Sequence, residues 1–381
     1  MSEIKVNSIK GVGASTAAIT VNNTDGTCTA NVTNNLSNRN ILINGAMQVN
    51  QRGDLTGQTS SAYGCDRMRV AMGSAGTWSL SQSTDTPDGF GTSMKLDCTT
   101  AKSSLDAGSF MLIQQKLEGQ QVQAFAKGTS AAKQFAVSFY IKSNVSGTYT
   151  AEIQDNDNSR IASKTFSISD GNWNRYSLIF PADTTGALDN DNNASMDVKI
   201  WLVGGTNYSS GTVNQSSWAA KSNPNRVSSS NVNLASSTSN ELYITGWQLE
   251  VGGVVTDFEH RSFGHELALC ERYFQIVVDG SETSNQYFCT TFNYTTGDSY
   301  GTFTYRTTMR TTPSLEQTSG SNYYYFYGNL AGQGFSSFAS LSHPGRRSTG
   351  IYATGLSLNQ GGAGGFTSQN SSAKVSMNAE L

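Results

Sequence analysis

The sequence predicts an all-β protein: a jelly-roll-like antiparallel β-sandwich, a short linking helix and a second, smaller β tip domain. Three observations lead to this prediction. Apolar and polar residues alternate over many short segments, which is the period of a strand with one buried face. Runs of Asn, Asp, Ser and Gly separate these segments, as turns do in antiparallel sheets. Helical spacing of apolar residues is scarce and is clear in one segment, within residues 263–276.

The composition limits the classes of function. Only 14% of the 381 residues are charged, against roughly 25% in average globular proteins, and Asn, Ser, Thr and Gly replace them. The net charge of −3 gives no broad positive field for nucleic acid. No window has the apolar length of a signal peptide or a membrane span. We therefore expect a protein that folds in a cytoplasm, does not insert into membranes and reaches any outside location by a route such as lysis.

The cysteines give no sign of metal or redox chemistry. They are odd in number and widely scattered, and none forms a CxxC pair, so zinc and redox motifs lack support. We expect buried thiols that act as small apolar residues. The five are Cys28, Cys65, Cys98, Cys270 and Cys289.

Residues 1–38 form the first predicted region. They are rich in Thr, Asn, Ala and Ser, and their few apolar residues cannot offset the entropy of ordering the segment. Such a segment is either disordered or ordered only by wrapping around copies of itself or a docking partner.

Residues 39–262 form the predicted sandwich. In Gln134–Lys142, the residues Phe135, Val137, Phe139 and Ile141 share one face. About eight such segments fit two antiparallel sheets packed face to face. The other strand candidates are Thr77–Leu80, Met94–Cys98, Phe110–Ile113, Tyr149–Ile153, Arg175–Phe180, Met196–Leu202 and Leu242–Leu249.

Residues 263–276 are the predicted linking helix, and residues 277–381 the β-rich tip. Ser262 can cap the helix, Glu266 suits its first turn, and apolar residues recur at helical spacing up to Phe274. In the tip, Tyr287–Phe292 and Gly301–Tyr305 have strand patterns, and Gly-rich loops follow them.

We find no catalytic residues and expect no cofactor. HExxH, GxSxG and GxxxxGK[ST] are all absent. A glycosidase pair among Glu250, Asp257 and Glu259, or of Glu152 with Asp155, would need a carboxylate separation that the sequence does not give.

Metal binding is left unknown by the sequence. The runs Asp155–Asn158 and Asp189–Asn192 place oxygen ligands at alternate positions, as calcium loops do, but they are also ordinary turns.

Aromatic and basic residues are the candidate binding residues. The run containing Tyr323, Tyr325 and Tyr327 puts aromatics on both faces of a strand, so some face solvent, a glycan or a partner subunit. Trp218, in a polar stretch, is a second candidate for exposure, whereas Trp201 and Trp247 have core patterns. The tip arginines, which can bind acidic sugars or phosphates or simply lie solvated, are Arg306, Arg310, Arg346 and Arg347.

Five phrases carry a resemblance to a known family. They are NRNILINGAMQVNQRG (Asn38–Gly53), YGCDRM (Tyr63–Met68), Ile244–Phe274, YRTTMRTTPSL (Tyr305–Leu315) and Ala379–Leu381. Together they resemble tail-fibre or receptor-binding proteins of tailed bacteriophages, with Met68 in place of the family's usual aromatic. The apolar residues of the first and third phrases look like scaffold that opens and closes the sandwich. The charges of Phe258–Ser262 (FEHRS) are expected to lock the sandwich to the helix.

The resemblance implies a homotrimeric tail fibre of the virion, assembled in the host cytoplasm. Residues 1–38 would attach it to phage tail, baseplate or adaptor proteins. The tip would bind a host glycan or lipopolysaccharide without chemistry. A structural tail adaptor or decoration protein and a polysaccharide depolymerase are the alternatives. Neither the receptor, the host nor the binding loops follow from the sequence.

Overall fold

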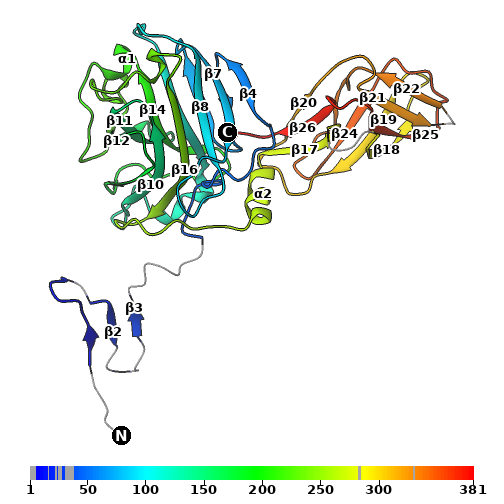
Figure 1. Cartoon of the computed structure of the whole chain (residues 1–381). Helices are drawn as coiled ribbons and strands as arrows, with labels where there is room; N and C mark the ends of the chain where they lie inside the picture. Colours follow the sequence, from blue (N-terminus) through cyan, green and yellow to red (C-terminus); the bar gives the residue numbers. More distant parts are fainter. Residues whose placement is uncertain are drawn as a thin grey trace.

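A computed structural model describes residues 6–15, 17–21, 24, 28–30, 38–281, 285–328 and 331–381. The predicted fold class is confirmed: antiparallel sheets form a β-sandwich, and a short helix leads to a smaller β domain, the tip (Figure 1). The sandwich and the tip lie beside each other in an elongated arrangement (Figure 1). No helix among the described residues is long and apolar enough to cross a membrane.

The sandwich consists of a six-stranded and a seven-stranded sheet. In spatial order the first contains β13 (Asn174–Phe180), β10 (Phe135–Ser143), β16 (Glu241–Val251), β8 (Ser93–Thr100), β7 (Thr77–Ser83) and β4 (Leu55–Gln58). The second contains β15 (Ala219–Ala220), β12 (Arg160–Ile168), β11 (Gly147–Asp155), β14 (Ala194–Gly204), β9 (Phe110–Glu118), β6 (Arg69–Gly73) and β5 (Ala62–Tyr63). Short helical turns are η1 (Gly119–Gln121), η2 (Gln123–Phe125), α1 (Thr206–Ser209), η3 (Asn223–Asn225) and η4 (Leu234–Ser236).

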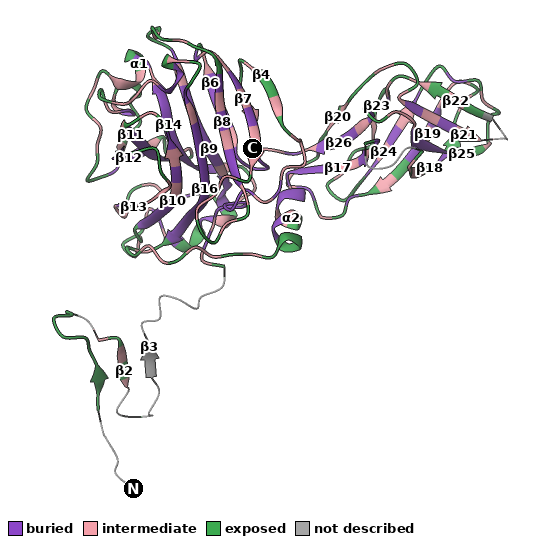
Figure 2. Ribbon diagram, viewed as in Figure 1, coloured by how far each residue is buried: buried purple, intermediate pink, exposed green. Residues whose placement is uncertain are grey.

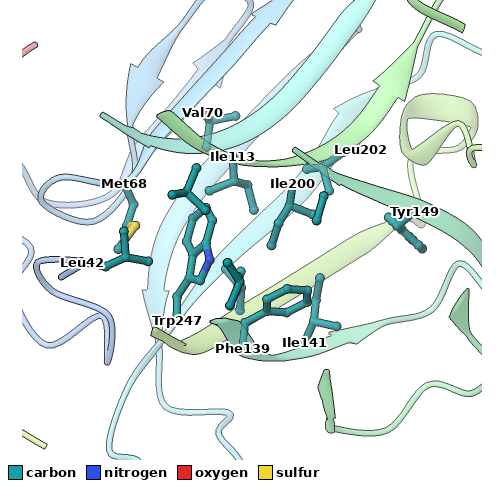
Figure 3. Packing of buried hydrophobic residues seen from close by; sticks show 14 of the residues in the cluster. Leu42, Met68, Val70, Ile113, Phe139, Ile141, Tyr149, Ile200, Leu202 and Trp247 are labelled. Atoms are coloured by element: carbon teal, nitrogen blue, oxygen red, sulfur yellow. The ribbon is translucent and has the colours of Figure 1, made fainter. Parts of the chain in front are cut away.

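Alternating side chains build the core between the two sheets. All four apolar residues predicted to share a face of β10 are buried, and Phe139 of β10 meets Phe166 of β12 edge to face at 5.1 Å between ring centroids. Trp247 lies in the same cluster, near Leu42 and Met68 (Figure 3). Purple, buried strands run through both sheets, while green, exposed residues gather in the loops (Figure 2). Such burial is the main stabilising contribution to the sandwich.

The first and third phrases run side by side, as the scaffold interpretation predicted. The Ile41 amide donates to the Leu249 carbonyl at 2.9 Å, and the Trp247 amide donates to the Gly45 carbonyl at 2.9 Å. A Cβ at Gly45 would lie 2.1 Å from the Trp247 carbonyl oxygen, so only glycine permits this approach. One scaffold residue departs from the prediction: Val251, at the end of β16, is 40% exposed.

The expected lock between sandwich and helix is also confirmed. Arg261 donates to the Leu42 carbonyl at 3.0 Å and to the Glu266 carboxylate at 3.3 Å. Glu259 accepts from the Asn40 amide at 2.8 Å. The charges of the FEHRS segment therefore tie the start of the sandwich to the helix.

Helix α2 spans Phe263–Glu271, shorter than the predicted 263–276. Ser262 occupies the N-cap position but makes no side-chain cap, and only its carbonyl receives the Glu266 amide at 3.0 Å. Phe274 belongs to the next strand, because residues Phe274–Asp279 pair with residues Lys374–Asn378, close to the C-terminus. The helical spacing of apolar residues predicted the helix, and strand pairing determines where it ends.

The tip contains a three-stranded and a seven-stranded sheet. The first has β17 (Phe274–Asp279), β26 (Lys374–Asn378) and β20 (Ser314–Gln317). The second has β22 (Ala331–Phe335), β21 (Tyr324–Gly328), β25 (Ala363–Ser368), β18 (Tyr287–Asn293), β19 (Ser299–Thr304), β24 (Ser348–Ala353) and β23 (Ser340–Ser342). Aromatic residues, among them Phe326, Phe338 and Phe366, fill the tip core.

Four of the phrases meet at the junction of sandwich and tip. Arg67 of YGCDRM is buried and pairs with Glu380, and its guanidinium lies over the Tyr273 ring at 3.5 Å. Arg310 donates to the Ala379 carbonyl at 2.7 Å and to the Asn192 carbonyl at 2.8 Å. These residues hold the tip against the sandwich, so the phrases describe a structural joint.

Near the N-terminus, β1 (Ser8–Ile9), β2 (Ile19–Val21) and β3 (Cys28–Ala30) pair in a small sheet. Residues 1–5, 16, 22–23, 25–27 and 31–37 of the predicted anchor lie outside the described residues. Its role as a tail anchor stays a prediction.

Candidate functional site

The outer face of the seven-stranded tip sheet carries a row of aromatic side chains. The pairing register puts Phe292 of β18 opposite Tyr300 of β19, and Tyr300 opposite Tyr352 of β24. The rings of Phe292 and Tyr300 stack at 6.0 Å between centroids, and those of Tyr300 and Tyr352 stack at 4.7 Å with planes 7° apart. We call these three residues the aromatic ladder. Phe292 is 52% exposed, so the row presents apolar ring surface to solvent.

Beside the ladder lies a cavity of about 540 Å³, which is within the usual size range of ligand pockets. Tyr294, 62% exposed, extends its aromatic wall. Hydroxyl and imidazole groups supply donors and acceptors, and Ser342 Oγ lies 2.9 Å from His343 Nδ1. The lining residues include no Asp, Glu, Lys or Arg: Phe292, Tyr294, Tyr300, Gly301, Thr302, Ser342, His343, Ser348, Thr349 and Gly350. Ring surface beside neutral polar groups suits an uncharged ligand with one apolar face and several hydroxyls.

The predicted tyrosines flank this face. Tyr324 and Phe326 of β21 point into the tip core, whereas Tyr323, Tyr325 and Tyr327 are half-buried. The rings of Tyr325 and Tyr327 stack at 5.7 Å. The Tyr327 hydroxyl accepts from the Gln369 amide group at 2.8 Å. The alternation predicted for this strand is therefore present.

Sheet pairing places the two aromatic groups on one surface. Tyr327 is opposite Gly365, and Gly365 is opposite Thr290. Thr290 is two residues from Phe292 on β18, so both side chains point to the same side of the sheet. The outer face of the tip thus joins the predicted tyrosines to the ladder, which the sequence reasoning missed. The alternation of Phe292 and Tyr294 before a turn was the signal that could have found it.

The expectation that Trp218 is exposed is wrong. Trp218 is only 7% exposed, its indole nitrogen donates to the Pro181 carbonyl at 2.7 Å, and its ring lies 5.5 Å from that of Phe135. The reason is non-local: the next two residues form β15, which pairs with β12 at the sheet edge and turns the indole into the core. Trp201 and Trp247 are buried, as predicted.

The tip arginines differ in how far they are available to a ligand. Arg346 and Arg347 are exposed in the segment between β23 and β24, next to His343 and Ser348 of the cavity in sequence, and Arg346 Nε donates to the Met309 carbonyl at 3.0 Å. Arg306 pairs with Glu271 at 2.8 Å. Arg310 is not available for a ligand, because its guanidinium donors are taken up by the junction carbonyls described above.

Four of the five carboxylates considered for catalysis are engaged in structural contacts, whereas the Asp257 side chain is 91% exposed. Glu152 is fully buried and accepts from Arg226 at 2.7 Å and from Lys199 at 3.2 Å. Burial acts to raise the pKa of Glu152, but the adjacent Lys199 and Arg226 outweigh it and lower that pKa. Glu250 accepts from the Thr256 amide at 3.0 Å. Fixed donors thus engage both carboxylates, and the lowered pKa keeps Glu152 ionised.

The side chain of Lys127 contacts the first of the two loops considered for calcium, Asp155–Asn158. The Lys127 ammonium is fully buried and lies 2.5 Å from Asp155, 3.1 Å from Asp183 and 2.8 Å from the Thr185 carbonyl. The second loop packs on the first, since the Asp189 amide donates to Asp157 at 2.9 Å. Within the described part of the chain, no group of three His, Cys, Asp or Glu residues is placed to hold a metal ion.

Three of the predicted buried thiols are buried, namely Cys65, Cys98 and Cys270, whereas Cys289 is half-buried. Burial raises the pKa of Cys289 to about 12 and raises that of the others. The Cys28 side chain lies outside the described residues.

No family model matches the sequence, and no curated protein matches it significantly. Solved structures of carbohydrate-binding modules are similar to it at low scores. The CBM22-1–GH10 modules of Clostridium thermocellum xylanase 10B, in complex with xylohexaose, match at 10% identity and a TM-score of 0.30, over 57% of this chain and 29% of theirs.

Two further structures of carbohydrate-binding modules are also similar at low scores. The family 11 module of C. thermocellum, in complex with a mixed-linked tetrasaccharide, matches at 12% identity and a TM-score of 0.26, over 55% of this chain and 98% of the module. The CBM22-1–CBM22-2 tandem of Paenibacillus barcinonensis Xyn10C matches at 7% identity and a TM-score of 0.27, over 92% of this chain and all 100% of the tandem.

Proposed function

We propose that this chain is a glycan-binding protein that holds its ligand without chemistry, and that the tip carries the site. The observation that carries the proposal is the aromatic ladder beside the 540 Å³ cavity. A sugar ring has an apolar face of C–H groups, which can stack on Tyr300, and a rim of hydroxyls, which can bond Ser342, Thr302 and His343. The uncharged lining favours a neutral segment of a glycan.

We further propose that the protein is a homotrimeric receptor-binding tail fibre of a tailed bacteriophage. The support is the five phrases. Their shared residues lie in the scaffold and at the junction, so they would stay constant while the tip surface changes with the host. The receptor would be a host surface glycan or lipopolysaccharide, and residues 1–38 would attach the fibre to the phage tail. Three tips on one fibre would raise avidity well above the affinity of one site.

Binding of the purified full chain to a bacterial glycan array tests the proposal. We expect binding to one class of glycan, and an affinity loss of about 10-fold or more for Tyr300→Ala, because the stacking surface is removed. Phe263→Ala is the matched control: Phe263 is 56% exposed on helix α2, away from the ladder, so its loss should not change binding.

Two outcomes would contradict the proposal. If no glycan binds, or if Tyr300→Ala binds as the unchanged protein does, the tip face is not the site. Release of reducing ends from a bound polysaccharide would instead identify a depolymerase. The trimer is tested separately, by the mass of the full chain in solution from light scattering.

A further inference from the structure

A second hollow lies on the sandwich, on the outer face of its seven-stranded sheet. Strand register builds its floor in rows: Arg69 of β6 is opposite Gln114 of β9, which is opposite Lys199 of β14. In the next row, Leu112 lies opposite Trp201. The hollow has a volume of about 350 Å³. We call it the cationic groove, and its lining is Arg69, Ala71, Phe110, Leu112, Gln114, Lys116, Gln154, Asn156, Asp197, Lys199, Trp201, Tyr208, Lys221 and Arg226.

The groove concentrates positive charge in a chain whose net charge is −3. Its lining has five cations and one carboxylate, Asp197. Two of the cations are neutralised locally, because Lys199 and Arg226 pair with the buried Glu152, and Lys199 also pairs with Asp197 at 3.1 Å. The negative charges of Glu152 and Asp197 therefore balance the positive charges of Lys199 and Arg226.

The three remaining cations are Arg69, Lys116 and Lys221. Among the residues that the structure describes, none of the three has a carboxylate within ion-pair distance. Burial and the positive charges of Arg69 and Lys199 lower the pKa of Lys116. Burial, Arg226 and Lys199 likewise lower the pKa of Lys221. Lys116 is thus repelled by Arg69 and Lys199, and Lys221 by Arg226 and Lys199, and a bound anion would relieve this repulsion.

The apolar part of the groove is formed by the half-buried rings of Phe110 and Tyr208 and by the buried indole of Trp201. Trp201 is 1% exposed, and the Arg226 guanidinium lies over its ring at 4.9 Å. Tyr208 packs on Trp201 at 5.4 Å and on Phe110 at 5.8 Å. The Trp201 indole nitrogen is buried without a hydrogen-bond partner, which is uncommon for a buried donor. Unpaired cations beside aromatic rings fit a ligand with both an anionic group and a sugar ring.

We propose that the cationic groove is a second binding site, which takes a saccharide bearing an anionic group such as a carboxylate, sulfate or phosphate. Lys116 and Arg69 hold the anionic group, Lys221 adds positive charge to the groove, and Phe110 and Tyr208 contact the sugar ring. The site is separate from the tip cavity, whose lining is uncharged, and it does not depend on the function proposed for that cavity. A chain with both sites would bind neutral and acidic segments of glycans at different places.

Isothermal titration calorimetry of the full chain tests this site. The anionic probes are oligogalacturonate, sialyllactose and a heparin tetrasaccharide, and the neutral probe is maltotriose. We expect at least one anionic probe to bind, maltotriose not to compete with it, and binding to weaken as salt rises from about 50 mM to about 500 mM. Lys116→Gln with Lys221→Gln should weaken binding about 10-fold or more, because one charge-assisted contact and a second positive charge of the groove are lost.

Lys102→Gln with Lys133→Gln, outside the groove, removes the same charge and should leave binding unchanged. If the groove variant melts at a lower temperature than the unchanged protein, Arg69→Gln replaces it, since Arg69 is only half-buried. The proposal is overturned if no anionic probe binds, or if the groove and control variants bind equally. Equally tight binding of inorganic phosphate would overturn the saccharide part. The Tyr300→Ala variant should bind the anionic probe normally, which separates this test from that of the tip.

Discussion

Replacement of Glu380 by Gln should destabilise the protein far more than an average surface change. The Arg67 side chain is 1% exposed and that of Glu380 is 6% exposed. Gln keeps the shape of the side chain but removes the charge. Arg67 would then lose its charged partner and keep the Lys116 carbonyl, at 2.6 Å, the face of the Tyr273 ring and a neutral amide acceptor.

The expected loss follows from this burial. Breaking a buried ion pair by removing one partner costs roughly 3–5 kcal/mol, and we expect about 3 kcal/mol because the Gln carbonyl can still accept a hydrogen bond. For a domain of about 200 residues, each kcal/mol lowers the melting temperature by about 2–4 °C, which gives about 6–12 °C here.

Calorimetric melting and urea unfolding of the full chain measure the effect. Asp106→Asn is the control, because it breaks the exposed Lys102–Asp106 pair, which should contribute less than about 1 kcal/mol. The double change Arg67→Met with Glu380→Leu should recover part of the loss, since the two most buried charges are removed together, while Arg52 loses its contact with Glu380 at 3.4 Å. A melting shift for Glu380→Gln no larger than that of Asp106→Asn would refute the reasoning.

Three further predictions concern stability. Lys127→Met should cost about 3–5 kcal/mol in urea unfolding, because it leaves fully buried Asp155 without its cation; a loss below about 1 kcal/mol would contradict this. Gly45→Ala should cost about 1–3 kcal/mol, because its Cβ would meet a backbone carbonyl, whereas Gly171→Ala, with open space around it, should be neutral. Acid should destabilise the protein: burial acts to raise the pKa of Glu118, but hydrogen bonds from Arg272 and Tyr273 lower it below its ordinary value. The resulting stability is present above that ordinary value and is lost as the pH falls through the lowered pKa, so melting temperatures between about pH 5 and about pH 2 should fall less for Glu118→Gln.

The sequence by itself determined the local structure. Period-2 alternation identified the strand β10 and its inward face, and helical spacing identified α2, because both patterns reflect contacts within one short segment. The FEHRS lock was also predictable, since its charges lie directly between the sandwich and the helix in the chain.

Only the tertiary structure decided which surfaces carry the candidate sites. Alternation gives the two faces of each strand, but not which strands are neighbours. Tyr300 and Tyr352 are far apart in sequence and stack because β19 pairs with β24. The cationic groove arises in the same way, from the register of β6, β9 and β14.

Trp218 shows that a local pattern can also predict exposure where the fold buries a side chain. A polar stretch favours exposure, but the pairing of β15 with a distant strand buries the indole. A lysine is usually exposed, and only the fold surrounds Lys127 with Asp155 and Asp183. In each case the deciding contact joins segments that are remote in the chain, and its energy depends on burial that no local pattern records.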